Sequence, residues 1–180
     1  MIKTFTVLAA AVLLVTVIPL QGCSYSQPVL NDGKRLEFEP IDATYLGNSG
    51  CTTPQLIALA SKPTLPEKLN IISKQFILSV DYSKYFVLSA SYGFTSVKYS
   101  GIIITDIWQK ENQVYVRAQF YKPHADNYVI EKNKFNPALS VKVNKENLMQ
   151  YGKITFILLD DYLIERARTS AVIHLPAGVR

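Results

Sequence analysis

The alternation of apolar and polar residues over 113–122 is the sequence feature that most constrains the fold. One set of alternate positions is wholly apolar, namely Val114, Val116, Ala118 and Phe120. Because successive side chains of a strand point to opposite faces, this pattern predicts a strand with one buried face. The turn material at 110–112 predicts that this strand forms an antiparallel hairpin with the strand before it.

Similar short alternating segments recur at 85–92, 139–143 and 153–159. A further strand is expected over 97–107, and the run at 76–80 is expected to be extended. Only one clear helix is predicted, over 67–74 directly after Pro66, because proline is favoured in the first turn of a helix. The predicted class is therefore mainly β, with an antiparallel sheet forming a sandwich or a partly open barrel and one or two short helices.

The first 22 residues have the composition of a secretory signal peptide. Lys3 is their only charged residue, and the run from Thr6 to Leu20 is almost wholly apolar. Such a run is short for a membrane span, which needs about 20 apolar residues. We therefore divide the chain into a signal peptide at 1–22, a flexible spacer at 23–40 and one β-rich globular domain at 41–180.

The segment Leu20-Gln21-Gly22-Cys23 resembles the lipobox of bacterial lipoproteins. The resemblance implies cleavage before Cys23, lipidation of its thiol and a membrane anchor. The alternative is an ordinary signal peptide in which Cys23 is an early mature residue. Ser24 stands where an Asp would mark retention at the inner membrane. The resemblance thus implies a lipid-anchored protein of the cell envelope, at the outer membrane if the cell is Gram-negative, facing the periplasm or the cell surface.

The remaining titratable residues suggest no catalytic or metal site. With Cys23 lipidated, Cys51 has no partner in the chain, and we expect it to be a small buried hydrophobe rather than a nucleophile. His124 and His174 lack the spacing of a zinc site; we expect a solvated His124 and a core or edge His174. The Asp160-Asp161 pair is expected to form a turn rather than a paired-carboxylate site. We predict no enzyme activity, no metal and no cofactor.

The charge balance bears on possible partners. The formal net charge is +5, and loss of Lys3 with the signal peptide lowers it to +4. The basic residues are dispersed and alternate with acidic ones, which is not the pattern of a nucleic-acid-binding protein. We expect the membrane, through the lipid anchor, and another envelope protein as partners.

A second resemblance lies in the core of the chain. The segment from Val80 to Leu88, with Asp81-Tyr82-Ser83-Lys84 at its start, is similar to the Asp-Phe-Ser-Lys strand of PrcB C-terminal-like domains. The following Gly-containing turn, the Tyr-bearing strand to Ile107 and the alternating strand to Phe120 occur in the same order. The resemblance covers about residues 45–145. It implies an accessory role beside a surface protease complex rather than peptidase activity.

Aromatic residues supply the candidate binding face. Three of them cluster around one predicted turn and two share the polar face of the strand at 113–122: Tyr92, Phe94, Tyr99, Tyr115 and Tyr121. Tyrosine offers apolar contact area with a polar end and is enriched at protein interfaces. These rings either cover a sheet face or bind a partner. The sequence therefore predicts a non-catalytic binding or accessory subunit, with a small-ligand or lipid-binding module as the alternative.

Overall fold

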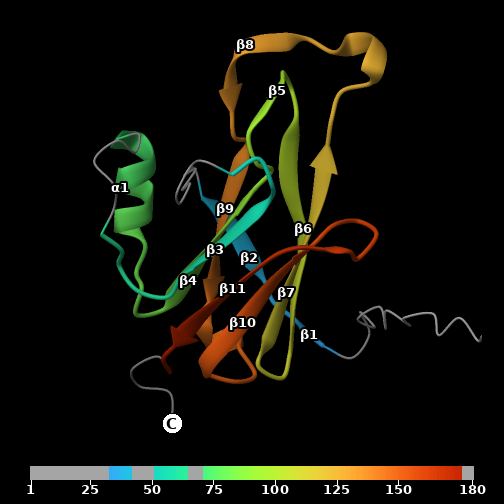
Figure 1. Cartoon of the computed structure of the whole chain (residues 1–180). Coiled ribbons are helices and arrows are strands. Elements are labelled where there is room, and N and C mark those ends of the chain that lie inside the picture. Colours follow the sequence, from blue (N-terminus) through green and yellow to red (C-terminus); the bar gives the residue numbers. More distant parts are fainter. Residues whose placement is uncertain (1–32, 42–50, 65–70, 176–180) are drawn as a thin grey trace, which may run out of the picture.

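The computed structural model describes residues 33–41, 51–64 and 71–175. Two sheets pack face to face (Figure 1). In the first sheet the strand order is β1 (Lys34–Arg35), β6 (Gly101–Lys110), β7 (Gln113–Tyr121), β10 (Gly152–Leu159) and β11 (Glu165–Ile173). In the second it is β2 (Phe38–Ile41), β9 (Ala138–Asn144), β4 (Tyr85–Ser91) and β3 (Gln55–Leu59).

Two short strands and one helix complete the fold. Strands β5 (Thr95–Val97) and β8 (Ile130–Phe135) pair as a separate two-stranded sheet beyond one end of β6 and β7 (Figure 1). The helix α1 (Ile71–Ser79) lies beside the second sheet, on the side away from the first. Short 3-10 turns cover Ala125–Asn127 and Lys145–Asn147. The predicted mainly β sandwich with a short helix is confirmed.

Most strand pairs are antiparallel, and the predicted hairpin of β6 with β7 is confirmed. One pairing differs from the expected antiparallel pattern, because β10 runs parallel to β7, with Phe156 opposite Val114. Parallel neighbours need a long connection, and here the chain crosses to β8 and β9 before it returns as β10.

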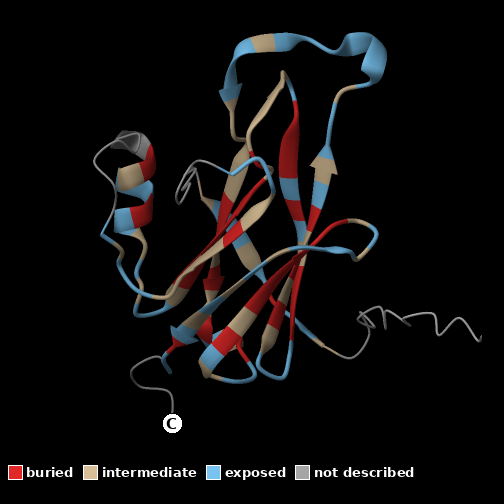
Figure 2. Ribbon diagram, viewed as in Figure 1, coloured by how far each residue is buried: buried red, intermediate tan, exposed pale blue. Residues whose placement is uncertain are grey.

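The core fills the space between the two sheets. Of the apolar positions of β7 that the alternation singled out, Val114, Val116 and Ala118 are buried there and Phe120 is half-buried. Phe86 and Leu88 of β4 are buried with them. The rings of Phe86 and Phe156 join the two sheets, with centroids 5.6 Å apart. In Figure 2 buried positions occur along strands of both sheets, whereas β8 is mostly exposed and β5 is intermediate.

Part of the expected spacer belongs to the domain. Strands β1 and β2 lie within or next to 23–40, and Leu36 between them is only 1% exposed. The Leu36 amide donates to the Ile107 carbonyl at 2.8 Å. The short alternation Leu36-Glu37-Phe38 was the available signal for a strand. Residues 23–32 of the expected spacer lie outside the described residues.

The expected extended run at 76–80 is wrong, because α1 continues to Ser79. Ile77 is fully buried and Ser73, four residues earlier, is also buried, so both lie on one helical face. The Ser79 hydroxyl donates to the Phe76 carbonyl at 2.8 Å. A run of three apolar residues does not distinguish a strand from a buried helix face. Of the predicted helix, 67–70 fall outside the described residues.

Candidate functional site

The structure does not bring the five predicted aromatic residues together. Tyr115 and Tyr121 share one face of β7, but six residues of strand separate them by about 20 Å. Tyr115 stacks on Trp108 at 5.3 Å, near the β6–β7 turn. Tyr121 lies at the other end, over its cross-strand partner Gly101.

The other three rings also have separate surroundings. Tyr92 packs against Phe120, with ring centroids 5.9 Å apart. Phe94 is half-buried, and its amide donates to the Cys51 carbonyl at 3.1 Å. Tyr99 is 65% exposed and has a φ of 64°. Left-handed backbone is uncommon for a non-glycine residue, and here it forms part of the connection between β5 and β6.

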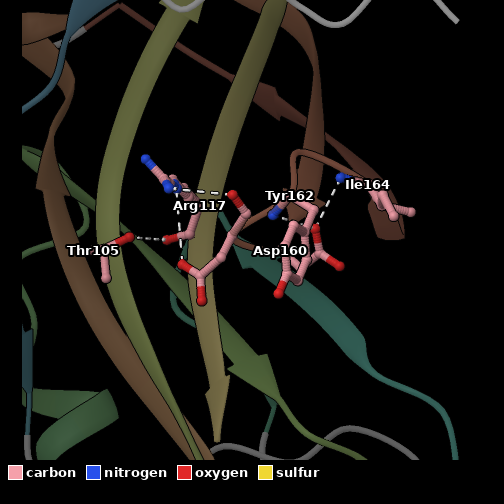
Figure 3. Close-up of polar contacts among 6 residues, drawn as sticks. Thr105, Arg117, Asp160, Tyr162 and Ile164 are labelled. Atoms are coloured by element: carbon pink, nitrogen blue, oxygen red, sulfur yellow. Dashed lines mark hydrogen bonds and ion pairs between the residues drawn. The ribbon is translucent and has the colours of Figure 1, made fainter.

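A compact turn between β10 and β11 is held by hydrogen bonds to the Asp160 carboxylate. The side chain of Asp160 is only 7% exposed. One of its oxygens accepts the amides of Tyr162 and Ile164, each at 2.9 Å, as Figure 3 shows. The other accepts the Arg166 guanidinium, whose Nε lies at 2.8 Å. The expectation of a turn at Asp160-Asp161 is confirmed.

These contacts determine the protonation of Asp160. Burial raises the pKa of its carboxyl, but the hydrogen bonds from the Ile164 amide and from Arg166 lower the pKa by more. The net pKa therefore lies below the usual range, and the carboxylate is ionised at neutral pH. Arg166 pairs with it from the start of β11, which closes the turn.

Arg117 ties this turn to the neighbouring strand β7 (Figure 3). Its Nη2 donates to the Asp161 carbonyl at 3.2 Å, and its Nε lies 3.9 Å from the Asp161 carboxylate. Leu163 takes a φ of 62°, and its amide donates to the Asp160 carbonyl. The turn is thus held from both sides, and it presents the Tyr162 side chain, which is 78% exposed.

A pocket of about 370 Å³ opens beside this turn. It is lined by Thr52, Pro54, Tyr92, Phe120, Lys122, Asp160, Asp161, Tyr162 and Arg166. We call it the Tyr92–Tyr162 pocket. Its walls mix aromatic rings with charged and hydroxyl groups, and it opens to solvent. A lipid-binding module instead needs an enclosed and mostly apolar cavity.

Sequence reasoning singled out Tyr92 but missed the remainder of this pocket as a binding site. Its residues come from the segment before β3, the ends of β4 and β7, and the β10–β11 turn. Thr52 reaches it because Gly93, with a φ of +93°, lets the chain pass close to the Thr52 carbonyl. The Asp-Asp-Tyr sequence was the one local signal.

A second candidate lies at the end of the sandwich that carries β5 and β8. Six large apolar side chains there are at least two-fifths exposed: Tyr99, Ile103, Tyr121, Tyr128, Val129 and Ile130. We call this the distal apolar surface. The Lys98 amide donates to the Val129 carbonyl at 2.8 Å, and Val97 pairs with Ile130. These contacts hold the loop that carries three of the six residues against β5.

The cysteine and histidines differ in part from expectation. Cys51 is exposed rather than buried, since it precedes β3 on an irregular segment at the surface. His174 is exposed too, because β11 and the core end at Ile173. His124 is solvated as expected, with Nδ1 3.2 Å from the Asp126 carboxylate. Within the described ranges, no group of three or more His, Cys, Asp or Glu side chains is placed to hold a metal ion.

Comparison with protein-family models, curated proteins and solved structures found no match. The lipobox and PrcB-like resemblances therefore stay predictions. In the described part of the chain, no helix is long and apolar enough to cross a membrane. The candidate functional surfaces among the described residues are the Tyr92–Tyr162 pocket and the distal apolar surface.

Proposed function

We propose that this protein is a lipid-anchored envelope lipoprotein that binds another envelope protein as a non-catalytic accessory subunit. The observation that carries the proposal is the distal apolar surface. Monomeric soluble proteins rarely expose large contiguous apolar patches, and those that they do expose often mark interaction sites. The Leu20–Cys23 segment supports the anchor.

The position of this surface fits an anchored binding subunit. Strand β1, where the described chain begins, pairs with Trp108 and Gln109 at one end of β6. The distal apolar surface lies beyond Gly101, at the other end of β6 (Figure 1). Ten residues of strand separate these ends by about 30 Å. The surface is therefore directed away from the point where the anchored segment enters the domain.

The composition of the surface suits a protein partner. Its three tyrosines offer broad apolar faces with polar ends, which is typical of protein interfaces. The Lys98–Glu131 ion pair, at 3.5 Å, lies beside the apolar residues and gives the surface a polar rim. Tyrosine side chains have only two rotatable χ angles, so they lose less conformational entropy on binding than long flexible side chains do.

Site-specific photo-crosslinking in intact cells tests the proposal. A photoreactive residue at Tyr128 should capture a defined envelope protein, identified by mass spectrometry. The same residue at Lys153, exposed on β10 at the other end of the sandwich, is the matched control. Val129→Asp should abolish the adduct at Tyr128 while the protein stays folded. An absent adduct at Tyr128, or the same adduct from both positions, would refute a partner at this surface.

A further inference from the structure

The Tyr92–Tyr162 pocket has a size that suits a small ligand. Binding sites for small molecules usually measure about 300–1,000 Å³, and this pocket measures about 370 Å³. One wall is the β10–β11 turn, which the buried Asp160 carboxylate holds in place. The opposite wall contains the ring pair of Tyr92 and Phe120. Such preformed walls lower the entropic cost of binding.

Two cations and two carboxylates line the pocket, and Lys122, which is exposed, is the one of the two cations that has no ion-pair partner among the described side chains. Arg166 is paired with Asp160, and Asp161 lies beside Arg117. The Lys122 ammonium lies over the Tyr92 ring, 5.9 Å from its centroid. Among the described side chains, no carboxylate forms an ion pair with Lys122. The pocket therefore favours a ligand with a single negative charge near Lys122.

The other groups of the pocket specify the remainder of the ligand. The Tyr92 and Tyr162 rings offer apolar faces, and Pro54 adds a third apolar surface. The Thr52 hydroxyl and the Asp161 carboxylate supply hydrogen-bonding partners for hydroxyl groups. A sugar ring has an apolar C–H face for an aromatic ring and hydroxyls around its edge. A sugar acid adds the one carboxylate that Lys122 requires.

We propose that the Tyr92–Tyr162 pocket binds an acidic sugar unit of a glycan. The sugar carboxylate pairs with the Lys122 ammonium, and a face of the sugar ring stacks on the exposed Tyr162 ring. A segment of nucleic acid fits less well, because several phosphates would meet a single unpaired cation. This site shares no residue with the distal apolar surface, although Tyr121 of that surface lies between the pocket residues Phe120 and Lys122 in the chain.

The test is a titration of the full-length protein in neutral detergent, followed by calorimetry and amide NMR. The probe is a tetrasaccharide of alternating glucuronic acid and N-acetylglucosamine, and the neutral comparison is a tetrasaccharide of N-acetylglucosamine. We expect saturable binding of the acidic probe, with shifts at Tyr92, Lys122 and Tyr162. Lys122→Gln should weaken that binding about tenfold, the effect of losing one charged hydrogen bond, and reduce the preference over the neutral sugar.

Three variants control the titration. Lys132→Gln, an exposed lysine on β8, should leave binding unchanged. Tyr162→Ala should weaken the binding of both sugars without unfolding the protein, because its side chain is exposed. Val129→Asp should abolish binding of the protein partner at the distal apolar surface but leave sugar binding at the Tyr92–Tyr162 pocket unchanged. The inference is overturned if the acidic tetrasaccharide shows no saturable binding, or if Lys122→Gln binds it with unchanged affinity. It is also overturned if an acetylated Asp-Tyr-Asp peptide binds more tightly than the acidic tetrasaccharide, because that result would assign the pocket to a protein segment.

Discussion

The guanidinium of Arg166 donates two hydrogen bonds to the buried carboxylate of Asp160, which also accepts two backbone amides of its own turn. This ion pair forms one wall of the Tyr92–Tyr162 pocket. It connects the end of β10 to the beginning of β11, six residues later in the chain. Both the stability of the domain and the geometry of the pocket depend on it.

Replacing Asp160 should destabilise the protein strongly. In Asp160→Ala the two backbone amides and the Arg166 guanidinium lose their acceptor inside a partly buried turn. Leaving buried donors without their acceptor typically costs about 1–3 kcal/mol. The Arg166 side chain is 44% exposed, so the loss of its ion pair adds little to this cost. Urea unfolding followed by circular dichroism measures the loss. Asp161→Ala is the matched control, since its carboxylate is more exposed and only 3.9 Å from Arg117; we expect a loss of about 1 kcal/mol or less. Equal losses in both variants would contradict this role of Asp160.

The stabilising effect of Asp160 should depend on pH in a defined direction. Its folded-state pKa is lowered, whereas the unfolded chain titrates near the ordinary value of about 3.9. The ionised carboxylate therefore stabilises the fold above the unfolded pKa, and this contribution is lost as the pH falls through the folded pKa. The difference in unfolding free energy between the wild type and Asp160→Asn should be constant above about pH 5 and shrink below about pH 4. A difference that stays constant to pH 2 would exclude the carboxylate charge as its cause.

Gly93 should tolerate substitution much less well than Gly152. Both have a positive φ, +93° and +94°, so an alanine is strained at either position. At Gly93 an added Cβ would also lie 2.6 Å from the Thr52 carbonyl oxygen, whereas at Gly152 it would meet nothing within 4 Å. Gly152→Ala should cost about 1 kcal/mol of unfolding free energy and Gly93→Ala more. Gly93→Ala should also weaken ligand binding, because it displaces Thr52 from the pocket wall. Equal losses of unfolding free energy in the two variants would show that the chain relieves the close contact between the added Cβ and the Thr52 carbonyl without an energetic cost.

Cys23→Ser should release the protein from the membrane. Without a thiol the residue carries no acyl chains, and stable anchoring needs more than one chain. Membrane fractionation and detergent phase partitioning measure the shift to the soluble fraction. Cys51→Ser is the matched control and should stay with the membrane, since Cys51 lies in the exposed segment before β3. A Cys23→Ser protein that has lost residues 1–22 and still stays in the membrane fraction would refute the lipid anchor.

The local pattern was sufficient for strands that alternate regularly. Strand β7 follows the predicted positions because a period of two is a property of neighbouring residues. The pattern was insufficient at 76–78, where three apolar residues in succession fit a helix face as well as a strand. It also missed β8, whose mixed residues form a strand only because β5 lies beside them.

The candidate sites depend even more than the strands do on residues that are distant in the sequence. The Asp160-Asp161 turn was predictable, but the burial of Asp160 depends on Arg166, which the antiparallel pairing of β10 with β11 returns to the turn. Tyr115 and Tyr121 do share a strand face, yet strand length places them at opposite ends of β7. Lys122 reaches the pocket only because β7 ends beside Tyr92.

The β class, the β6–β7 hairpin and the turn at Asp160 follow from the sequence, because each depends on contacts between residues close together in the chain. The Leu20–Cys23 segment, which resembles a lipobox, is likewise read from the sequence. The tertiary structure alone decided the parallel pairing of β10 with β7, the separation of the aromatic residues and the Tyr92–Tyr162 pocket. These features depend on how strands distant in sequence pair and which residues the packed sheets bring together, and an alternating pattern carries no information about either.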